Sequence, residues 1–178
     1  GDIGLAEREL RTFVEDRFGA TPARSRSADI AGAIEDHLAD RGYLRPSVEV
    51  AAAPPGQPVD IVFRVAFGRR ARVGTVSYRA EDPADSADIE ARVSIRAGDD
   101  YDRLKIRGRL DAAAEHWRAR RYYEASVTAD PEISEDGATV DLLITFLRGP
   151  LVTVSVRDNA LTAKQLAEFV PAEREGSI

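Results

Sequence analysis

The chain contains no cysteine and no methionine, and aromatic residues make up only 7% of it. Without cysteine the protein has no disulfide, no zinc thiolate, no iron–sulfur ligand and no thiol nucleophile. No stretch approaches the roughly 20 consecutive apolar residues of a membrane-spanning helix, and no signal peptide is visible. Because the sequence starts with glycine, we expect it to be a processed product or a segment of a longer protein.

The charge balance is acidic, and the hydrophobic content is sufficient for a core. The formal net charge is −6, and 43% of the 178 residues are hydrophobic. A general nucleic-acid-binding domain needs a basic face that neutralises phosphates, so we expect no nucleic-acid partner. The length allows one large domain or two small ones.

An internal repeat is the most informative feature of the sequence. Two segments of the chain align without gaps when one is shifted along the sequence by a constant number of residues. Identical or similar residues then fall at matching positions. The matched pairs are His37 with His116, Leu38 with Trp117, Tyr43 with Tyr122, Ser47 with Ser126 and Val48 with Val127.

The repeat continues toward the C-terminus of each copy. After two additional residues in the second copy, Val-Asp-Ile-Val at 59–62 matches Val-Asp-Leu-Leu at 140–143, and Gly68 matches Gly149. A third copy begins after that glycine, because Val-Thr-Val-Ser-Val at 152–156 resembles Gly-Thr-Val-Ser-Tyr at 74–78.

Hydrophobic periodicity predicts the elements of the second copy in the order strand, helix, helix, strand, turn, strand. Gly98 is expected to end the first helix. The last strand is apolar on both faces except at Asp141 and Thr145, so we expect it in the centre of the sheet. The predicted ranges are Arg72–Tyr78, Ser86–Ala97, Asp102–Arg121, Tyr122–Ala129, Ile133–Gly137 and Val140–Leu147.

The first copy follows the same pattern from its first helix onward. Gly19 and Gly42 are expected to end its two helices, and Ala53–Gly56 its hairpin turn. Its opening strand is missing, which leaves one side of Val59–Ala66 unpaired. The apolar positions are Leu10, Phe13, Val14 and Phe18 in the first helix, Ile30, Ile34 and Leu38 in the second, and Val48, Val50, Val59, Ile61, Phe63 and Val65 in the strands. In the third copy, Thr162–Gln165 has the spacing of a capping box.

The order β-α-α-β-β resembles the polypeptide-transport-associated (POTRA) domain. The resemblance also rests on Gly42-Tyr43, degenerate as Arg121-Tyr122, and on the Val-Asp-Ile/Leu start of each last strand. It implies an α+β fold of tandem modules, each a three-stranded mixed sheet packed against two antiparallel helices. The expected modules are 1–70 without its first strand, 71–150 complete, and 151–178 as the strand and helix that begin another.

The resemblance implies a non-enzymatic periplasmic arm of an outer-membrane protein from a Gram-negative bacterium. Its partners would be unfolded outer-membrane protein clients, periplasmic chaperones or lipoproteins, and the parent chain would carry a C-terminal membrane barrel. A client strand would pair with a free sheet edge by β-augmentation, and the groove between that edge and the second helix would be the companion surface. The expected binding residues are Ser47, Val48, Glu49, Val50, Ala51, Ser126, Val127, Thr128, Ala129 and Asp130.

Two alternatives remain open. A KH-type RNA-binding module shares the order β-α-α-β-β, but it needs a GxxG loop between its helices. The segments Gly19–Pro22 and Gly98–Tyr101 lack the second glycine. The other alternative is a POTRA module of a two-partner secretion or cell-division protein.

No motif of an enzyme stands out, whether a Ser-His-Asp arrangement, a phosphate loop or a carboxylate pair. We therefore predict no catalysis, cofactor, metal site or small-molecule substrate. His37 and His116 are interpreted as solvated helix residues, and Asp99, Asp100 and Asp102 as helix-capping residues, because they lack the glycine and glutamate of a calcium loop.

Two further sets of charged residues have simple interpretations. Arg69, Arg70 and Arg72 form a basic run that we interpret as a source of solubility or of an interdomain salt bridge, with contact to anionic lipid or a partner as the alternative. Asp60 and Asp141 recur inside strands, where we expect them to face solvent or a neighbouring module, with a buried interaction with an arginine as the alternative.

Overall fold

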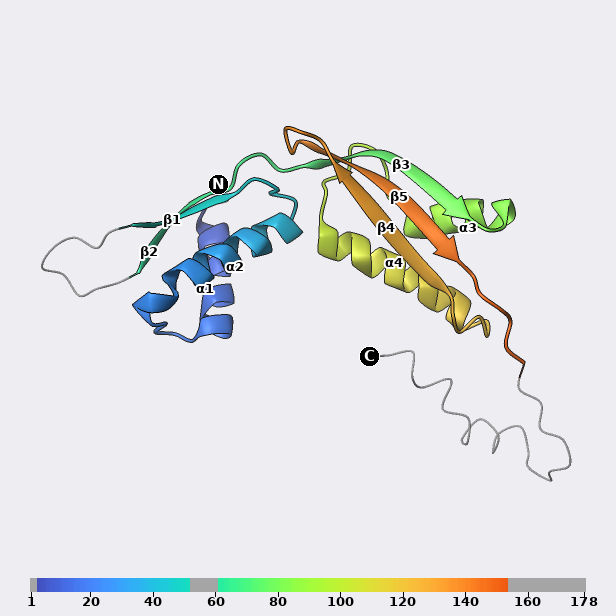
Figure 1. The fold of residues 1–178 in the computed structure, drawn as a ribbon, viewed down its shortest axis with the longest axis horizontal. Coiled ribbons are helices and arrows are strands. Elements are labelled where there is room, and N and C mark those ends of the chain that lie inside the picture. The colour runs from blue at the N-terminus through green and yellow to red at the C-terminus, as the bar shows by residue number, and fades with distance from the viewer. Residues whose placement is uncertain (1–2, 52–60, 154–178) are drawn as a thin grey trace, which may run out of the picture. The chain divides into compact units, whose positions relative to one another are not determined.

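The computed structural model describes residues 3–51 and 61–153, and its contacts divide the chain into two units (Figure 1). Unit 1 consists of Gly1–Arg72, Asp100–Arg103 and Ile133–Thr139. Unit 2 consists of Val73–Asp99, Leu104–Glu132 and Val140–Ile178. Within the described residues, no helix combines the length and the apolar character that crossing a membrane requires.

Unit 2 has the predicted order strand, helix, helix, strand, strand, and it confirms the α+β class. Its sheet has the order β3-β5-β4, so the last strand lies in the centre, as predicted. Figure 1 shows β3 and β5 running in the same direction and β4 running against them, which makes the sheet mixed. The elements are β3 (Arg72–Ala80), α3 (Pro83–Val93), α4 (Arg103–Arg118), β4 (Ser126–Ile133) and β5 (Thr139–Leu147).

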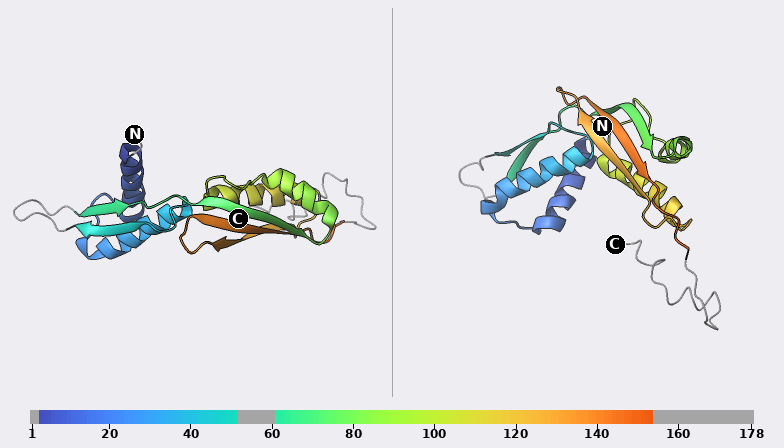
Figure 2. Two further views of the ribbon diagram at one scale, coloured as in Figure 1. Left: turned by 90° about the horizontal axis from the view of Figure 1, so that it is seen from above. Right: turned by 45° about the vertical axis from the view of Figure 1, so that its right-hand side comes forward.

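Alternation along β5 creates the core of unit 2, because every second side chain of a strand points to the same face. Figure 2 shows α3 and α4 covering that face of the sheet. The Trp117 ring of α4 packs 5.2 Å from the Phe146 ring of β5. Burying each large apolar side chain stabilises the fold by about 1.5–3 kcal/mol. The core residues from these three elements are Ile89, Val93, Ile106, Leu110, Val140, Leu142, Ile144 and Phe146.

Helix α3 ends earlier than predicted. Asp82 caps its N-terminus by accepting a hydrogen bond from the Ala84 N–H (2.9 Å). The helix stops at Val93, where Ser94 adopts a left-handed conformation with φ 51°, so the prediction of Gly98 as its end is wrong. The physical reason is burial, since Ile95 turns into the core directly after Ser94. Gly98 also has a positive φ, but it lies in the following loop.

The boundaries of β4 also differ from the prediction. Tyr122 belongs to a turn closed by the Ala125 N–H donating to its carbonyl (2.9 Å), and the strand starts only at Ser126. At the other end β4 continues to Ile133. The turn at Asp136 and Gly137 is where it was predicted, and the Gly137 N–H donates to the Ser134 carbonyl (2.9 Å).

Asp141 faces outward from β5, as predicted, but its carboxylate is not simply solvated. It accepts a hydrogen bond from the Thr75 N–H of the neighbouring strand β3. A Cβ at Gly74 would lie 2.1 Å from the same carboxylate, so a larger residue there would displace the Asp141 side chain. Asp60 lies outside the described residues.

In its described residues, unit 1 contains two α-helices, a 3₁₀ turn and a two-stranded sheet. Gly19 and Gly42 follow the two helices with positive φ values of 86° and 94°, which confirms both predicted ends. The predicted turn at Ala53–Gly56, Val59 of the last strand and the capping box at Thr162–Gln165 lie outside the described residues. The elements are α1 (Ile3–Phe18), a 3₁₀ turn η1 (Arg24–Arg26), α2 (Ser27–Asp40), β1 (Ser47–Ala51) and β2 (Val62–Ala66).

The core of unit 1 is small and one-sided. One cluster of buried side chains comes from α2, as Ile30, Ile34 and Leu38, and Ala71 and Tyr101 of unit 1 are buried as well. Figure 2 shows α1 standing across α2 rather than running alongside it. The apolar stripe of α1 is therefore only partly buried, at Leu10, Phe13, Val14 and Phe18.

Glycine substitutions in unit 1 should change stability in opposite directions. Gly42 has a positive φ, and a Cβ there would lie 2.1 Å from the Tyr101 carbonyl oxygen, so Gly42→Ala should lower the free energy of unfolding by more than about 1 kcal/mol. Gly32 lies inside α2, and a Cβ there would have no atom within 4 Å, so Gly32→Ala should raise it by about 0.5–1 kcal/mol. Urea unfolding of both variants measures the difference, and equal effects would contradict the conformational argument.

Candidate functional site

Strand β1 carries the first predicted set of binding residues. Val48 and Val50 are in register with Val65 and Phe63 of β2, whose side chains pack against the helical core. The remaining three predicted residues, Ser47, Glu49 and Ala51, therefore lie on the opposite face, because side chains alternate along a strand. Within the described residues β1 pairs only with β2, so its other side is a free edge.

The free edge of β1 is partly occupied by a side chain. The Val48 N–H donates a hydrogen bond to Glu35 Oε1 of α2 (3.0 Å). In an antiparallel pair, alternate residues direct both backbone groups to the same side, so Val50 also points its N–H and C=O to the free edge. Glu35 thus takes one of the donors that an added strand would use.

Strand β4 carries the second predicted set, and it is an edge of the β3-β5-β4 sheet. Val127 is buried and Ala129 is half-buried toward the helices, while Thr128 and Asp130 are exposed. The repeat matches Glu35 with Ala114, which is only 2% exposed and has no polar side chain. No acceptor from that position reaches the β4 edge.

Pro131 limits the length of this edge. By the repeat, Val127 and Ala129 match Val48 and Val50, so their backbone groups point away from β5. Pro131 is two residues further along β4 and has no N–H to offer. Proline is tolerated in sheets at such edge positions. The part of β4 open to a partner strand is therefore Ser126–Asp130.

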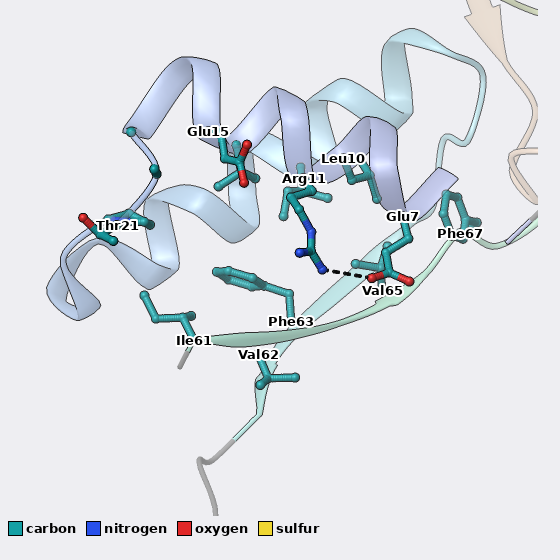
Figure 3. A pocket seen from close by; sticks show the side chains of 15 residues that line it. Glu7, Leu10, Arg11, Glu15, Thr21, Ile61, Val62, Phe63, Val65 and Phe67 are labelled. Carbon is teal, nitrogen blue, oxygen red and sulfur yellow. Dashed lines mark hydrogen bonds and ion pairs between the residues drawn. The ribbon is translucent and has the colours of Figure 1, made fainter. Parts of the chain in front are cut away.

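A cavity of about 820 Å³ lies at the other edge of the β1–β2 sheet (Figure 3). Its apolar lining comes mainly from α1 and β2, with Ile34 of α2, and none of its lining residues belongs to β1. Figure 3 shows the Phe63 ring directed from β2 toward α1, with the Arg11–Glu7 ion pair (3.2 Å) beside it. The cavity lies on the far side of β2 from the groove predicted between the β1 edge and the second helix, and that groove stays a prediction.

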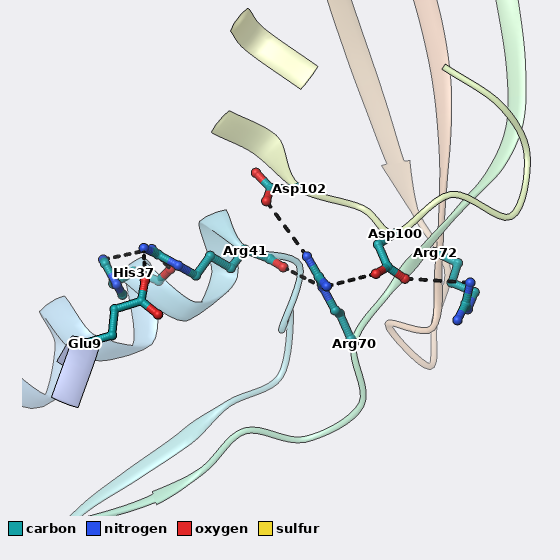
Figure 4. Close-up of polar contacts among 7 residues, drawn as sticks. All are labelled: Glu9, His37, Arg41, Arg70, Arg72, Asp100 and Asp102. Atoms are coloured by element: carbon teal, nitrogen blue, oxygen red, sulfur yellow. Dashed lines mark hydrogen bonds and ion pairs between the residues drawn. The ribbon is translucent and has the colours of Figure 1, made fainter. Parts of the chain in front are cut away.

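His37 is not a solvated helix residue, so that interpretation was wrong. Its ring lies 4.0 Å from the Phe13 ring, and its Nδ1 lies 3.2 Å from an Arg41 guanidinium nitrogen (Figure 4). Burial and the Arg41 charge lower the pKa of His37, against opposing effects of Glu9 and Asp40. The imidazole therefore belongs in its neutral form to the contact between α1 and α2.

Within unit 1, Arg70 and Arg72 of the arginine run lie beside Asp100 and Asp102 of the aspartate cluster (Figure 4). Arg70 forms ion pairs with Asp100 (2.9 Å) and Asp102 (3.8 Å) and donates to the Arg41 carbonyl (3.0 Å). Arg72 lies 3.6 Å from Asp100. The carboxylates thus neutralise guanidinium groups, and no group of three or more His, Asp or Glu side chains among the described residues is arranged to hold a metal ion.

Comparison with known proteins identifies the fold. No family model matches the chain, and no curated protein matches it. The structure of the third to fifth POTRA domains of BamA from Haemophilus influenzae is similar, with 18% identity and a TM-score of 0.50, over 79% of this chain and 58% of that one. The chain thus spans less than two thirds of that structure. At this identity the likeness shows that the chain has the POTRA fold.

Two further structures show weaker likeness. The N-terminal domain of Omp85 from Thermosynechococcus elongatus has 17% identity and a TM-score of 0.44, over 76% of this chain and 56% of that one. CdiB from Escherichia coli has 18% identity and a TM-score of 0.39, over 83% of this chain and 25% of that one.

Acidification should destabilise unit 1 through His37. Above about pH 6.5, the ordinary pKa of histidine, the imidazole is neutral in both folded and unfolded states and does not affect stability. Below it the unfolded chain binds a proton that the folded state resists, so stability falls as the pH decreases toward the lowered folded pKa. Thermal unfolding at neutral and mildly acidic pH should show a smaller loss for His37→Gln than for the wild type. The same pH slope in both proteins would show that His37 is not responsible.

Proposed function

We propose that this chain is part of the periplasmic arm of an outer-membrane protein from a Gram-negative bacterium. In this proposal the parent protein assembles or secretes other proteins, and the arm binds unfolded clients, chaperones or lipoproteins without catalysing a reaction. The POTRA fold shared with BamA supports it, together with the internal repeat of that module. A C-terminal membrane barrel in the parent chain is part of the same proposal.

We propose β-augmentation at the edge of β4 as the binding mechanism. The supporting observation is the contrast between the two edges, because Glu35 takes the Val48 N–H of β1, whereas the matching position beside β4 is Ala114. Main-chain pairing does not depend on the sequence of the partner, which suits a module that binds many clients. The open segment Ser126–Asp130 is short, and each net hydrogen bond contributes only about 0.5–1.5 kcal/mol, so the contact would be weak and transient.

Proline at matched positions of the two edges tests the choice of β4. Ala129→Pro removes an N–H that points to the free edge and leaves the pairing with β5 intact, and Val50→Pro is the matched change in β1. A fluorescein-labelled ten-residue peptide with alternating valine and threonine serves as the client strand in an anisotropy titration. Ala129→Pro should weaken binding about tenfold, the equivalent of about 1.4 kcal/mol, and Val50→Pro should leave it unchanged.

Circular dichroism of both variants controls for folding. Unchanged binding by a folded Ala129→Pro variant, or an equal loss in both variants, would reject β4 as the acceptor edge. Absence of any peptide binding by the wild type would reject strand addition itself.

Removal of the Glu35 carboxylate should open the β1 edge to the same peptide. Glu35→Ala leaves the Val48 N–H without its acceptor, whereas Glu35→Gln retains an oxygen that can accept the hydrogen bond. Backbone amide shifts in ¹H–¹⁵N spectra locate the bound peptide. Val48 and Val50 should respond to the peptide in Glu35→Ala but not in the wild type or in Glu35→Gln. A response of Val50 in the wild type would show that Glu35 does not protect this edge.

A further inference from the structure

Helices α3 and α4 of unit 2 carry basic side chains along the side on which the two helices meet. Arg109 Nη1 of α4 donates a hydrogen bond to the Ser94 carbonyl at the end of α3 (2.7 Å). Two turns further along α4, His116 Nδ1 lies 3.1 Å from Arg92 Nη1 of α3. Arg120 follows in the turn after α4 and donates to the His116 carbonyl (3.1 Å). We call Arg92, Arg109, His116 and Arg120 the basic stripe.

Carboxylates neutralise little of the basic stripe. Asp88 pairs with Arg92 (2.6 Å), whereas Arg109 and Arg120 donate only to backbone carbonyls among the described residues. Burial and then the charges of Arg92 and Arg120 lower the pKa of His116, against the effect of Asp88. Three arginines and one carboxylate therefore leave a net positive charge at this place, on a chain whose formal net charge is −6.

The shared fold does not require these charges, because the first copy lacks two of them. The shift that aligns the two copies pairs Phe13 with Arg92 and Ile30 with Arg109. Phe13 packs against the His37 ring at 4.0 Å, and Ile30 is 0% exposed. Both positions are apolar in the first module and are exposed arginines in the second. The positive charge of the stripe is therefore a property of the second module alone.

The stripe is long and narrow, which limits the shape of a partner. From Arg109 to Arg120 the chain advances about 17 Å, at about 1.5 Å per residue. An extended polypeptide covers that length with about five residues, at about 3.3 Å each. An anionic membrane would be repelled by the acidic chain as a whole, whereas a single extended chain can follow the stripe alone.

We propose that the basic stripe binds an extended acidic segment of another polypeptide, whose carboxylates pair with the guanidinium groups of Arg109 and Arg120. A guanidinium group can offer a carboxylate two parallel N–H donors, which gives the contact direction as well as charge. Because the stripe is exposed, the contact is weak and salt-sensitive. It lies on the helices and not on the β4 edge, so it does not depend on strand addition.

An anisotropy titration at low ionic strength tests this proposal with a rhodamine-labelled peptide of five glutamates between glycines. Arg109→Gln/Arg120→Gln removes two charges of the stripe and should weaken binding about tenfold. Arg64→Gln/Arg107→Gln is the matched control, because it removes two exposed arginines outside the stripe and should change the affinity less than about twofold. Arg109→Lys/Arg120→Lys keeps the charges and should retain most of the affinity. Circular dichroism checks that each variant is folded.

The two histidines of the chain locate the bound peptide. Bound carboxylates should raise the pKa of His116, because they offset the charges of Arg92 and Arg120. His37 lies outside the stripe, so its pKa should stay the same. A pH titration of both imidazole signals by NMR, with and without the glutamate peptide, measures the two values.

Absence of peptide binding by the wild type would overturn the proposal, and so would an equal loss in the two glutamine variants. A lysine variant that binds as weakly as Arg109→Gln/Arg120→Gln would reject charge as the cause. Binding that leaves the pKa of His116 unchanged, or that is lost in Ala129→Pro, would place the peptide elsewhere and overturn it too. Binding of phosphatidylglycerol vesicles without binding of the peptide would assign the stripe to a membrane surface instead.

Discussion

Backbone N–H and C=O groups on the free side of a strand must find partners, in the protein, in a ligand or in water. In unit 2 the backbone groups of β5 find partners on both sides, in β3 and in β4. The outer edges of β3 and β4 are the edges of this sheet. Among the described residues of unit 1, the strand pair β1–β2 leaves two edges, and their surroundings differ. One receives the Glu35 carboxylate at Val48, and the other borders a cavity.

Pairing of strands and burial of helices are coupled in this fold. In unit 2, whose sheet has three strands, the first helix is more deeply buried than in unit 1, whose described sheet has two. Ile89 and Val93 of α3 lie in the core of unit 2, but Leu10 and Val14 of α1 stay half-exposed.

The two copies have also diverged at matched positions. Tyr43 packs against the Phe67 ring at 5.4 Å, but its counterpart Tyr122 lies 5.5 Å from the Arg148 guanidinium. Arg148 also lies 5.8 Å from Trp117 and forms an ion pair with the buried Asp85 (3.3 Å). A cation thus replaces an aromatic ring in the second copy, and a buried carboxylate accompanies it. The two copies also differ where Glu35 of the first matches Ala114 of the second. Glu35 accepts a hydrogen bond from the β1 edge, whereas Ala114 has no polar side chain to do so at the β4 edge.

The sequence by itself determined the order of elements, the central position of the last strand and the helix ends at Gly19 and Gly42, because hydrophobic periodicity and the positive φ of glycine are local properties. It misplaced the end of α3, since burial of Ile95 and not the nearest glycine ends that helix. Only the tertiary structure decided that Glu35 reaches Val48, that His37 packs on Phe13 and that the cavity lies beside β2. Each of these depends on side chains from separate elements meeting in space, which no spacing along the chain specifies.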